Sequence, residues 1–148
     1  MPSIPENVKI DRLVVYKAQR KMVAFQGDTE LKTYVIALGF APEGHKEFEG
    51  DGKTPEGLYT INDRNPNSQY HLNLGVSYPN AKDRAHAKNL GKSPGGDIKI
   101  HGLPNGSADF GKFQALADWT HGCIAVTNPE IEELFEKVVD GAVIDIRP

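Results

Sequence analysis

A single cysteine preceded by a glycine is the part of this sequence that could carry out covalent chemistry. Cys123 lies in the run Thr120-His121-Gly122-Cys123-Ile124. A glycine at position 122 lets the backbone pass close to a bound substrate, because no Cβ atom obstructs the approach. The backbone amides of Gly122 and Cys123 could then point at one oxygen atom, as an oxyanion hole requires. The pattern therefore favours a cysteine nucleophile that attacks a carbonyl group.

Two histidines could take the proton of such a thiol. His121 precedes the cysteine by two residues, and His101 precedes it by 22, at the end of the alternating run Ile98-Lys99-Ile100-His101. Side chains two apart on one strand are separated by roughly 6–7 Å at Cα, whereas a residue on a neighbouring strand can sit directly opposite. We therefore predict that His101 is the base and that it lowers the pKa of the thiol. His121 is then a pocket wall or an oxyanion donor, with a structural histidine that ties a loop as the alternative.

Other interpretations of Cys123 compete with catalysis. A lone cysteine is most often a small buried hydrophobic residue. His101, His121 and Cys123 could also bind zinc, but structural zinc sites usually have four protein ligands and the sequence has a single cysteine. Zinc binding stays open as the less favoured chemistry.

The composition indicates one globular domain, residues 1–148. The hydrophobic content of 39% and the charged content of 25% suit a packed core. A net charge of -3 gives no concentrated basic surface for nucleic acid. No apolar run reaches the about 18–20 residues that span a bilayer. The N-terminal segment has no apolar signal region, and one cysteine excludes an internal disulfide.

The first hundred residues are predicted to form mainly strands, because short apolar or β-branched runs alternate with turn residues. The expected strands are Leu13–Tyr16, Met22–Phe25, Leu31–Leu38, Gly57–Ile61, His71–Val76 and one that ends at His101. The polar stretch Pro42–Pro55 is predicted as a surface loop and Asp63–Ser68 as a turn. Asn80–Asn89 has the composition of a short, exposed helix.

A second helix is predicted near the C-terminus. Thr127 and Glu130 have the spacing of a capping box. Four apolar residues then recur on one helical face. They are Ile131, Leu134, Phe135 and Val138. We expect Asp140-Gly141 to end this helix and Ala142–Ile146 to form the last strand, which completes a β-dominated α+β domain.

Four motifs, spread along the chain, together resemble those of the L,D-transpeptidase catalytic domain family, of the YkuD type. His101-Gly102, followed by Thr120-His121-Gly122-Cys123-Ile124, resembles the family's histidine and its Ser/Thr-x-Gly-Cys motif. Lys53–Ile61 resembles its Thr-Pro-x-Gly segment, Ser77–Asp83 its middle segment, and Gly95–Gly102 its approach to the histidine. The resemblance extends from about Asp11 to Ile146, nearly the whole chain.

This resemblance implies a mixed, β-sandwich-like fold with short helices and a bacterial enzyme of cell-wall biogenesis and cell shape. In the family, the cysteine cleaves the L,D bond between a diamino acid and D-alanine in a peptidoglycan tetrapeptide stem, leaving an acyl-enzyme. An amine from another stem then gives a cross-link, and water instead gives an L,D-carboxypeptidase. The histidine is oriented by the backbone carbonyl that follows it, which by position is that of Gly102. The resemblance implies no metal or organic cofactor, and covalent inhibition by carbapenems.

Two departures from the family bear on substrate and acceptor. Ala125 stands where many members carry Arg or Asn, and the 22-residue spacing implies an extended loop, Leu103–Gly111. A catalytically idle module that binds peptidoglycan peptides is therefore the alternative function.

Weaker candidates for substrate contacts lie in the same segments. Thr120 and Trp119 adjoin the cysteine, and Tyr70 begins a strand that lines the cleft in the family. Asp83 and His86 share one face of the predicted helix. For Trp119 we favour core packing over a pocket wall, and for the helical pair a solvated face. Four further polar residues are expected in an exposed loop rather than a site. They are His45, Lys46, Asp51 and Lys53.

The compartment depends on the true start of the protein. The chain belongs in the periplasm or cell envelope if an export signal was removed. It belongs in the cytoplasm, in peptidoglycan recycling, if Met1 is the native start. We expect a monomer that binds stem peptides, binds no nucleic acid and does not span a membrane.

Overall fold

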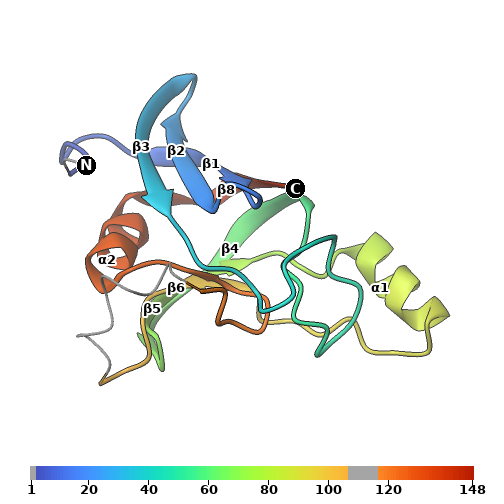
Figure 1. Ribbon diagram of the computed structural model, residues 1–148. Coiled ribbons are helices and arrows are strands. Elements are labelled where there is room, and N and C mark those ends of the chain that lie inside the picture. Colours follow the sequence, from blue (N-terminus) through green and yellow to red (C-terminus); the bar gives the residue numbers. More distant parts are fainter. Residues whose placement is uncertain (1–2, 107–116) are drawn as a thin grey trace.

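A curled, mixed β-sheet organises the computed structural model, which describes residues 3–106 and 117–148 (Figure 1). The strand order is β3-β2-β1-β8-β4-β5-β6-β7. The elements in chain order are β1 (Ile10–Tyr16), β2 (Lys21–Gln26), β3 (Thr29–Val35), β4 (Gly57–Ser68), β5 (His71–Val76), α1 (Ala81–Asn89), β6 (Lys99–His101), β7 (Ile124–Ala125), α2 (Asn128–Lys137) and β8 (Val138–Arg147). The β-dominated α+β class expected from the sequence is confirmed.

The strand β4 joins the two halves of the sheet. Its first residues, Gly57 to Thr60, pair with β8, and its later residues pair with β5. At the far edge the chain after β3 returns to β7, where Ala37 and Ala125 exchange backbone hydrogen bonds of 2.9 and 3.0 Å. The sheet therefore curls back on itself and encloses one core of buried aliphatic and aromatic side chains, among them Leu13, Tyr34 and Ile144.

The predicted turn at Asp63–Ser68 is wrong, because β4 continues through it. Arg64 pairs with Leu74, and Ser68 pairs with His71. Pro66 lies where the register shifts between Asn65 and Ser68, so its missing N–H is tolerated inside a strand. Cross-strand pairing with β5 thus overrides the turn-forming composition of this segment, although most of its side chains are exposed or half-buried.

The helix α2 forms as predicted but ends earlier. The Thr127 amide donates to Glu130 Oε1 at 2.8 Å, and Ile131 and Leu134 are fully buried. The helix stops at Lys137, whose ammonium group binds the backbone carbonyls of Pro5 and Glu6. Val138 already pairs with Ile10 of β1, so the last strand begins at Val138, four residues before its expected start at Ala142.

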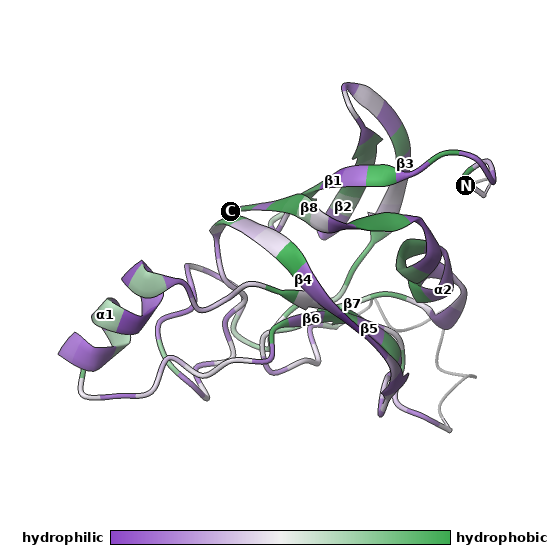
Figure 2. Cartoon of the chain, turned by 180° about the vertical axis from the view of Figure 1, so that it is seen from behind, coloured by the Kyte–Doolittle hydropathy of each residue, from purple (hydrophilic) through white to green (hydrophobic). Residues whose placement is uncertain are grey.

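The helix α1 confirms the prediction of a short, mostly exposed helix. Asn80 caps it, accepting a hydrogen bond of 2.8 Å from the Asp83 amide. Figure 2 shows that its residues are largely hydrophilic and that it stands away from the sheet. Within the described residues, neither helix is long and apolar enough to cross a membrane. Part of the predicted loop Leu103–Gly111 lies outside the described residues.

Candidate active site

Cys123 and His101 lie in the wall of one cavity of about 520 Å³. The cavity is formed by the end of β6, the segment before β7 and the β4–β5 hairpin. Its wall includes Asn65, Ser68, Tyr70, Asn73, Asp97, Lys99, His101, Trp119, Thr120, His121 and Cys123. The two residues predicted as nucleophile and base are therefore brought together from segments 22 positions apart in the sequence.

The register places His101 diagonally from the cysteine rather than directly opposite it. Strands β6 and β7 are parallel, with Ile100 beside Ile124 and His101 beside Ala125. Cys123 precedes β7 and lies next to Lys99, whose amide is 3.4 Å from Sγ. The register agrees with a base supplied by the neighbouring strand, although His101 lies beside Ala125 rather than directly opposite the cysteine.

The imidazole of His101 is held in one orientation by its own backbone. Its Nδ1 atom is 2.7 Å from the carbonyl oxygen of Gly102. A carbonyl can only accept, so Nδ1 carries the proton and Nε2 of the neutral ring has a free lone pair. Tyr70 stacks on this ring with centroids 4.4 Å apart. His101 is 4% exposed, and burial lowers the pKa of its imidazole, partly offset by the bond to Gly102.

The thiol of Cys123 is bonded to backbone groups. Its Sγ–H donates to the carbonyl oxygen of Asp97 at 3.3 Å, while the Lys99 amide donates to the sulfur. Burial raises the pKa of the thiol, although the Lys99 amide and the nearby lysine charges act in the opposite direction. The predicted lowering of this pKa is therefore wrong for the free protein. Both shifts favour the neutral thiol and the neutral imidazole over the ion pair in the free protein.

The turn before the cysteine is closed by Thr120. Its hydroxyl donates to the Cys123 carbonyl at 2.7 Å and accepts from the Gly122 amide at 3.1 Å. Thr120 had been a candidate for contacting substrate. It is 4% exposed and both of its hydroxyl bonds are made within the turn, so it holds the turn in place. The Gly122 amide is also occupied, so the expected pair of free amides is not present. The exposed side chain of His121 lies in the same cavity wall as the cysteine.

Gly122 is pressed against two other glycine-bearing segments. A Cβ atom on Gly39 would lie 2.1 Å from the Gly52 carbonyl oxygen and 3.1 Å from the Gly122 Cα atom. A Cβ atom on Gly122, whose φ is +139°, would lie 2.8 Å from the Lys53 carbonyl oxygen. These backbone-to-backbone contacts fix the position of the cysteine turn and explain why glycine is needed there.

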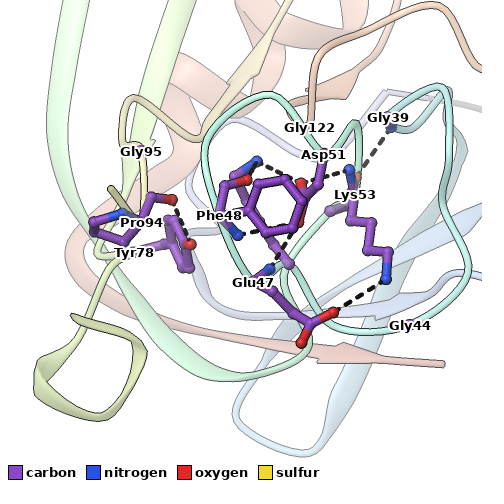
Figure 3. A network of polar contacts seen from close by, with 12 residues as sticks. Gly39, Gly44, Glu47, Phe48, Asp51, Lys53, Tyr78, Pro94, Gly95 and Gly122 are labelled. Atoms are coloured by element: carbon purple, nitrogen blue, oxygen red, sulfur yellow. Dashed lines mark hydrogen bonds and ion pairs between the residues drawn. The ribbon is translucent and has the colours of Figure 1, made fainter. Parts of the chain in front are cut away.

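The segment behind this turn is an ordered loop. Figure 3 shows Asp51 at its centre, close to Gly122. The carboxylate accepts from the amides of Glu47, Phe48 and Lys53 and pairs with Lys46 at 2.9 Å. The side chains of Lys46 and Asp51 are 3% and 4% exposed, so the prediction of an exposed loop is wrong for them. Burial would raise the pKa of Asp51, but the amide and ammonium donors outweigh burial and hold it below its usual value.

Aromatic side chains form one wall of the cavity. The Trp119 ring centroid is 5.7 Å from that of His101 and 6.1 Å from that of Tyr70. Trp119 is half-buried in this wall rather than packed in the core, contrary to the favoured prediction. The preceding residue, Asp118, pairs with Arg20 at 2.7 Å and accepts from the Leu38 amide. This ion pair anchors the start of the segment that carries the cysteine.

Asp83 and His86 lie in a different cavity, of about 640 Å³, whose wall contains neither Cys123 nor His101. Asp83 is buried and binds His45 Nε2 at 2.8 Å and the Tyr59 hydroxyl at 2.6 Å. His86 binds Glu47 at 2.9 Å. Both residues therefore tie α1 to the loop and strand beside it, and a solvated face is wrong for Asp83.

Three residues of the cavity, Asp97, Lys99 and Asn73, were not predicted as site residues from the sequence. The Asp97 carbonyl and the Lys99 amide are backbone groups, which residue type does not reveal. Asn73 carries a side-chain signal, since it is a polar residue within the apolar strand segment Leu72–Leu74. In the described residues, no three His, Cys, Asp or Glu side chains are placed to hold a metal ion, so the zinc alternative gains no support.

Comparisons with known proteins agree on one family. The family model described as the L,D-transpeptidase catalytic domain (YkuD) matches residues 10–146. The candidate L,D-transpeptidase YafK of Escherichia coli K12 is 33% identical over 120 residues, which are 80% of this chain and 41% of that protein.

Solved structures match the same fold. The helical cell shape determining protein Pgp2 of Campylobacter jejuni superposes with a TM-score of 0.68 and 28% identity, over 98% of this chain and 50% of its own. LD transpeptidase LdtMt1 in complex with imipenem superposes with a TM-score of 0.59 and 16% identity, over 92% and 58%, a likeness of fold alone. The chain thus spans about half the length of the relatives it matches.

The partial burial of the thiol, which raises its pKa, predicts its reaction with alkylating reagents. We expect the rate of iodoacetamide modification to be low at pH 7 and to rise about tenfold per pH unit up to pH 9, because only the thiolate reacts. Intact-mass spectrometry over a pH series measures this rate. A plateau below pH 8 would show instead that a thiolate–imidazolium pair exists in the resting protein.

The glycine contacts predict the effect of adding a methyl group. Gly39→Ala should lower the free energy of unfolding by about 1–3 kcal/mol, because neither the Gly52 nor the Gly122 backbone can yield easily. It should also speed alkylation of Cys123, as the displaced turn exposes the sulfur. Gly27→Ala is the control: its φ is +58° but its Cβ meets nothing within 4 Å, so stability should fall without a change in alkylation. Equal alkylation in both variants would contradict the proposed contact. Urea unfolding and intact mass are the measurements.

Proposed function

Because the chain belongs to the L,D-transpeptidase catalytic domain family, we propose that it cleaves the L,D bond between a diamino acid and D-alanine in peptidoglycan tetrapeptide stems. The observation that carries this proposal is the shared cavity of Cys123 and His101, in which His101 Nδ1 is bonded to Gly102. The bond leaves Nε2 as the nitrogen that can accept a proton. A single cysteine and a preset base are what an acyl-transfer enzyme needs.

In the proposed first half-reaction, a neutral thiol becomes the nucleophile as it attacks. His101 Nε2 takes the proton of Sγ while the sulfur bonds to the carbonyl carbon of the diamino acid. The resulting imidazolium gives this proton to the amine of D-alanine as the carbon–nitrogen bond breaks, leaving a thioester on Cys123. Burial disfavours both charged groups before substrate binds. Proton transfer and attack are therefore expected to occur together, as in general-base catalysis.

The proposed second half-reaction decides the type of enzyme. An amine that attacks the thioester carbonyl forms a new peptide bond and releases the thiol, which is transpeptidation. Water that attacks the same carbon releases a tripeptide, which is L,D-carboxypeptidase activity. In both cases His101 removes a proton from the attacking group and returns it to the sulfur.

Oxyanion stabilisation is assigned to the Cys123 amide and the His121 side chain. The Gly122 amide donates to Thr120 and is not counted among the donors. His121 is exposed beside the cysteine and contacts Phe40 edge-on, with centroids 5.8 Å apart. Its ring can thus turn toward an oxygen that develops negative charge at the attacked carbonyl.

A catalytically idle module that binds wall peptides is the second candidate. The thiol–Asp97 hydrogen bond and the raised pKa of Cys123 favour it, because both hold the sulfur in its unreactive form. The Nδ1–Gly102 bond favours the enzyme, since an idle pocket has no need of an oriented base. We therefore rank the enzyme first.

The proposed setting is the bacterial cell wall. Pgp2 is described as determining helical cell shape, and a role in shaping the wall through trimmed or cross-linked stems is proposed for this chain on that likeness. The cell envelope, or the cytoplasm during recycling of wall peptides, is the proposed compartment. No metal or cofactor takes part in the proposed steps.

Removal of the nucleophile tests the proposal directly. With a murein tetrapeptide, the wild-type protein should release D-alanine, and Cys123→Ala should lower the rate at least about 1000-fold. Mass spectrometry of the products measures both. Leu58→Ala is the control. The Leu58 side chain is 70% exposed and is not part of the wall of the cavity that holds Cys123, so the rate should be unchanged. Activity that survives in Cys123→Ala would refute the mechanism.

With a free D-amino acid present, an exchange product identifies a transpeptidase and tripeptide alone identifies a carboxypeptidase.

Reaction with a carbapenem tests the activated nucleophile without a peptide. Imipenem should add one acyl group to the wild-type protein and none to Cys123→Ala, as read from intact mass. His101→Gln should slow acylation by at least about 100-fold, because the proton of the thiol then has no acceptor of suitable basicity. An unmodified wild-type mass would favour the idle binding module.

A further inference from the structure

Asn73 lies beside the proposed base in a row of residues that crosses the sheet. In the middle of β5, it pairs with Asn65 of β4 on one side and with His101 of β6 on the other. Side chains directly opposite each other in antiparallel strands share a face, with Cβ atoms about 4.5–5.5 Å apart. All three residues line the cavity of Cys123. Asn73 is thus built into the same wall as the base.

The side-chain oxygen of Asn73 has no hydrogen-bond partner in the part of the chain that the structure describes. Asn73 is 8% exposed, and its Oδ1 atom is buried without a donor. Other asparagines do not share this property. The Oδ1 atoms of Asn65, Asn80, Asn105 and Asn128 each accept from a backbone amide, at 2.9, 2.8, 3.1 and 2.9 Å.

Stability does not account for an asparagine at this position. The residues on either side are Leu72 and Leu74, and asparagine is disfavoured in strands. A buried polar atom left without its hydrogen bond destabilises the folded state, so an apolar residue of similar size would fit this position better. Such atoms are rare in native proteins, and the exceptions concentrate where function requires them.

The missing partner is a group that a peptide supplies. A carboxamide carries one acceptor and two donors on the same plane, which matches the N–H and C=O of a peptide unit. Rotation about the Cβ–Cγ bond is soft, so Asn73 can turn either end toward the cavity. We propose that Asn73 is a substrate-contacting specificity residue whose carboxamide hydrogen-bonds a peptide group of the bound stem. This inference rests on the proposed function.

The strand order defines which part of the peptide Asn73 would contact. β5 lies two strands from β7, or about 10 Å at the usual strand spacing, which corresponds to roughly three residues of extended chain. A stem whose scissile carbonyl lies at Cys123 therefore passes His101 before it reaches Asn73. The contact is with a peptide group that flanks the scissile bond, and Asn73 selects for the length and backbone of the stem rather than for the bond that is cut.

Peptide binding in an inert background measures this contact without turnover. The murein tetrapeptide is titrated by calorimetry into Cys123→Ala and into Cys123→Ala with Asn73→Leu. Loss of one neutral hydrogen bond should weaken the Kd about 10-fold. The Tm of Asn73→Leu should stay the same or rise, because the orphaned oxygen has been removed. Asn62→Leu makes the same chemical change at an exposed position of β4 and should alter neither quantity.

Three outcomes would overturn the role of Asn73. They are an unchanged Kd, the absence of tetrapeptide binding to Cys123→Ala, and a fall of Tm in Asn73→Leu with unaltered affinity, which would make the residue structural. If the leucine variant loses both stability and affinity, Asn73→Ala decides. This variant removes the carboxamide without adding bulk, and it must still weaken binding. Release of D-alanine by the wild-type protein tests the proposed function separately. If the wild-type protein turns over and Asn73→Leu leaves the Kd unchanged, only the role of Asn73 is overturned.

Discussion

A close contact of three backbone segments is the constraint on which the cavity depends. Gly39, Gly52 and Gly122 meet without side chains between them, and a methyl group at Gly39 would overlap the Gly52 carbonyl. Gly39 also donates its amide to the Thr54 hydroxyl at 3.0 Å. The turn before Cys123 is thereby held against the loop that Asp51 organises, rather than by its own short strand β7. Strand β7 has two residues and could not fix a nucleophile alone.

Burial sets the electrostatic state of the cavity. The imidazole is buried and the thiol is partly buried, so the pKa of each is shifted toward the neutral form. The two lysines near the thiol are each paired, Lys46 with Asp51 at 2.9 Å and Lys99 with Asp63 at 3.6 Å. Asp97, whose carbonyl accepts a hydrogen bond from the thiol, has a φ of +54°, an uncommon conformation for a residue other than glycine. A substrate that displaces this hydrogen bond would free the proton for transfer to His101.

The sequence predicted the parts of the site that depend on residue type and failed on those that depend on packing. Cys123, His101 and the strand that ends at His101 could be found, because a nucleophile, a base and period-two alternation are visible in residue letters. The diagonal offset of His101 could not, since it depends on the register of two strands from distant segments. Nothing in the sequence distinguishes Lys46 and Asp51 from ordinary loop charges. Only the fold shows that they are buried as a pair.

The two register neighbours of His101 show how the closed sheet distributes polar groups. On one side is Ala125, fully buried and bonded through its backbone to Ala37 at the seam of the sheet. A larger polar side chain there would compete for the space that closes the seam.

On the other side is Asn73, where β5 faces the cavity and no seam has to close. Many family members carry a polar residue at position 125, where this chain has Ala125. The polar side chain next to the base is here the carboxamide of Asn73, on the other neighbouring strand of β6. Substrate recognition is thus expected to extend toward β5 and β4, while the seam side of the histidine serves packing.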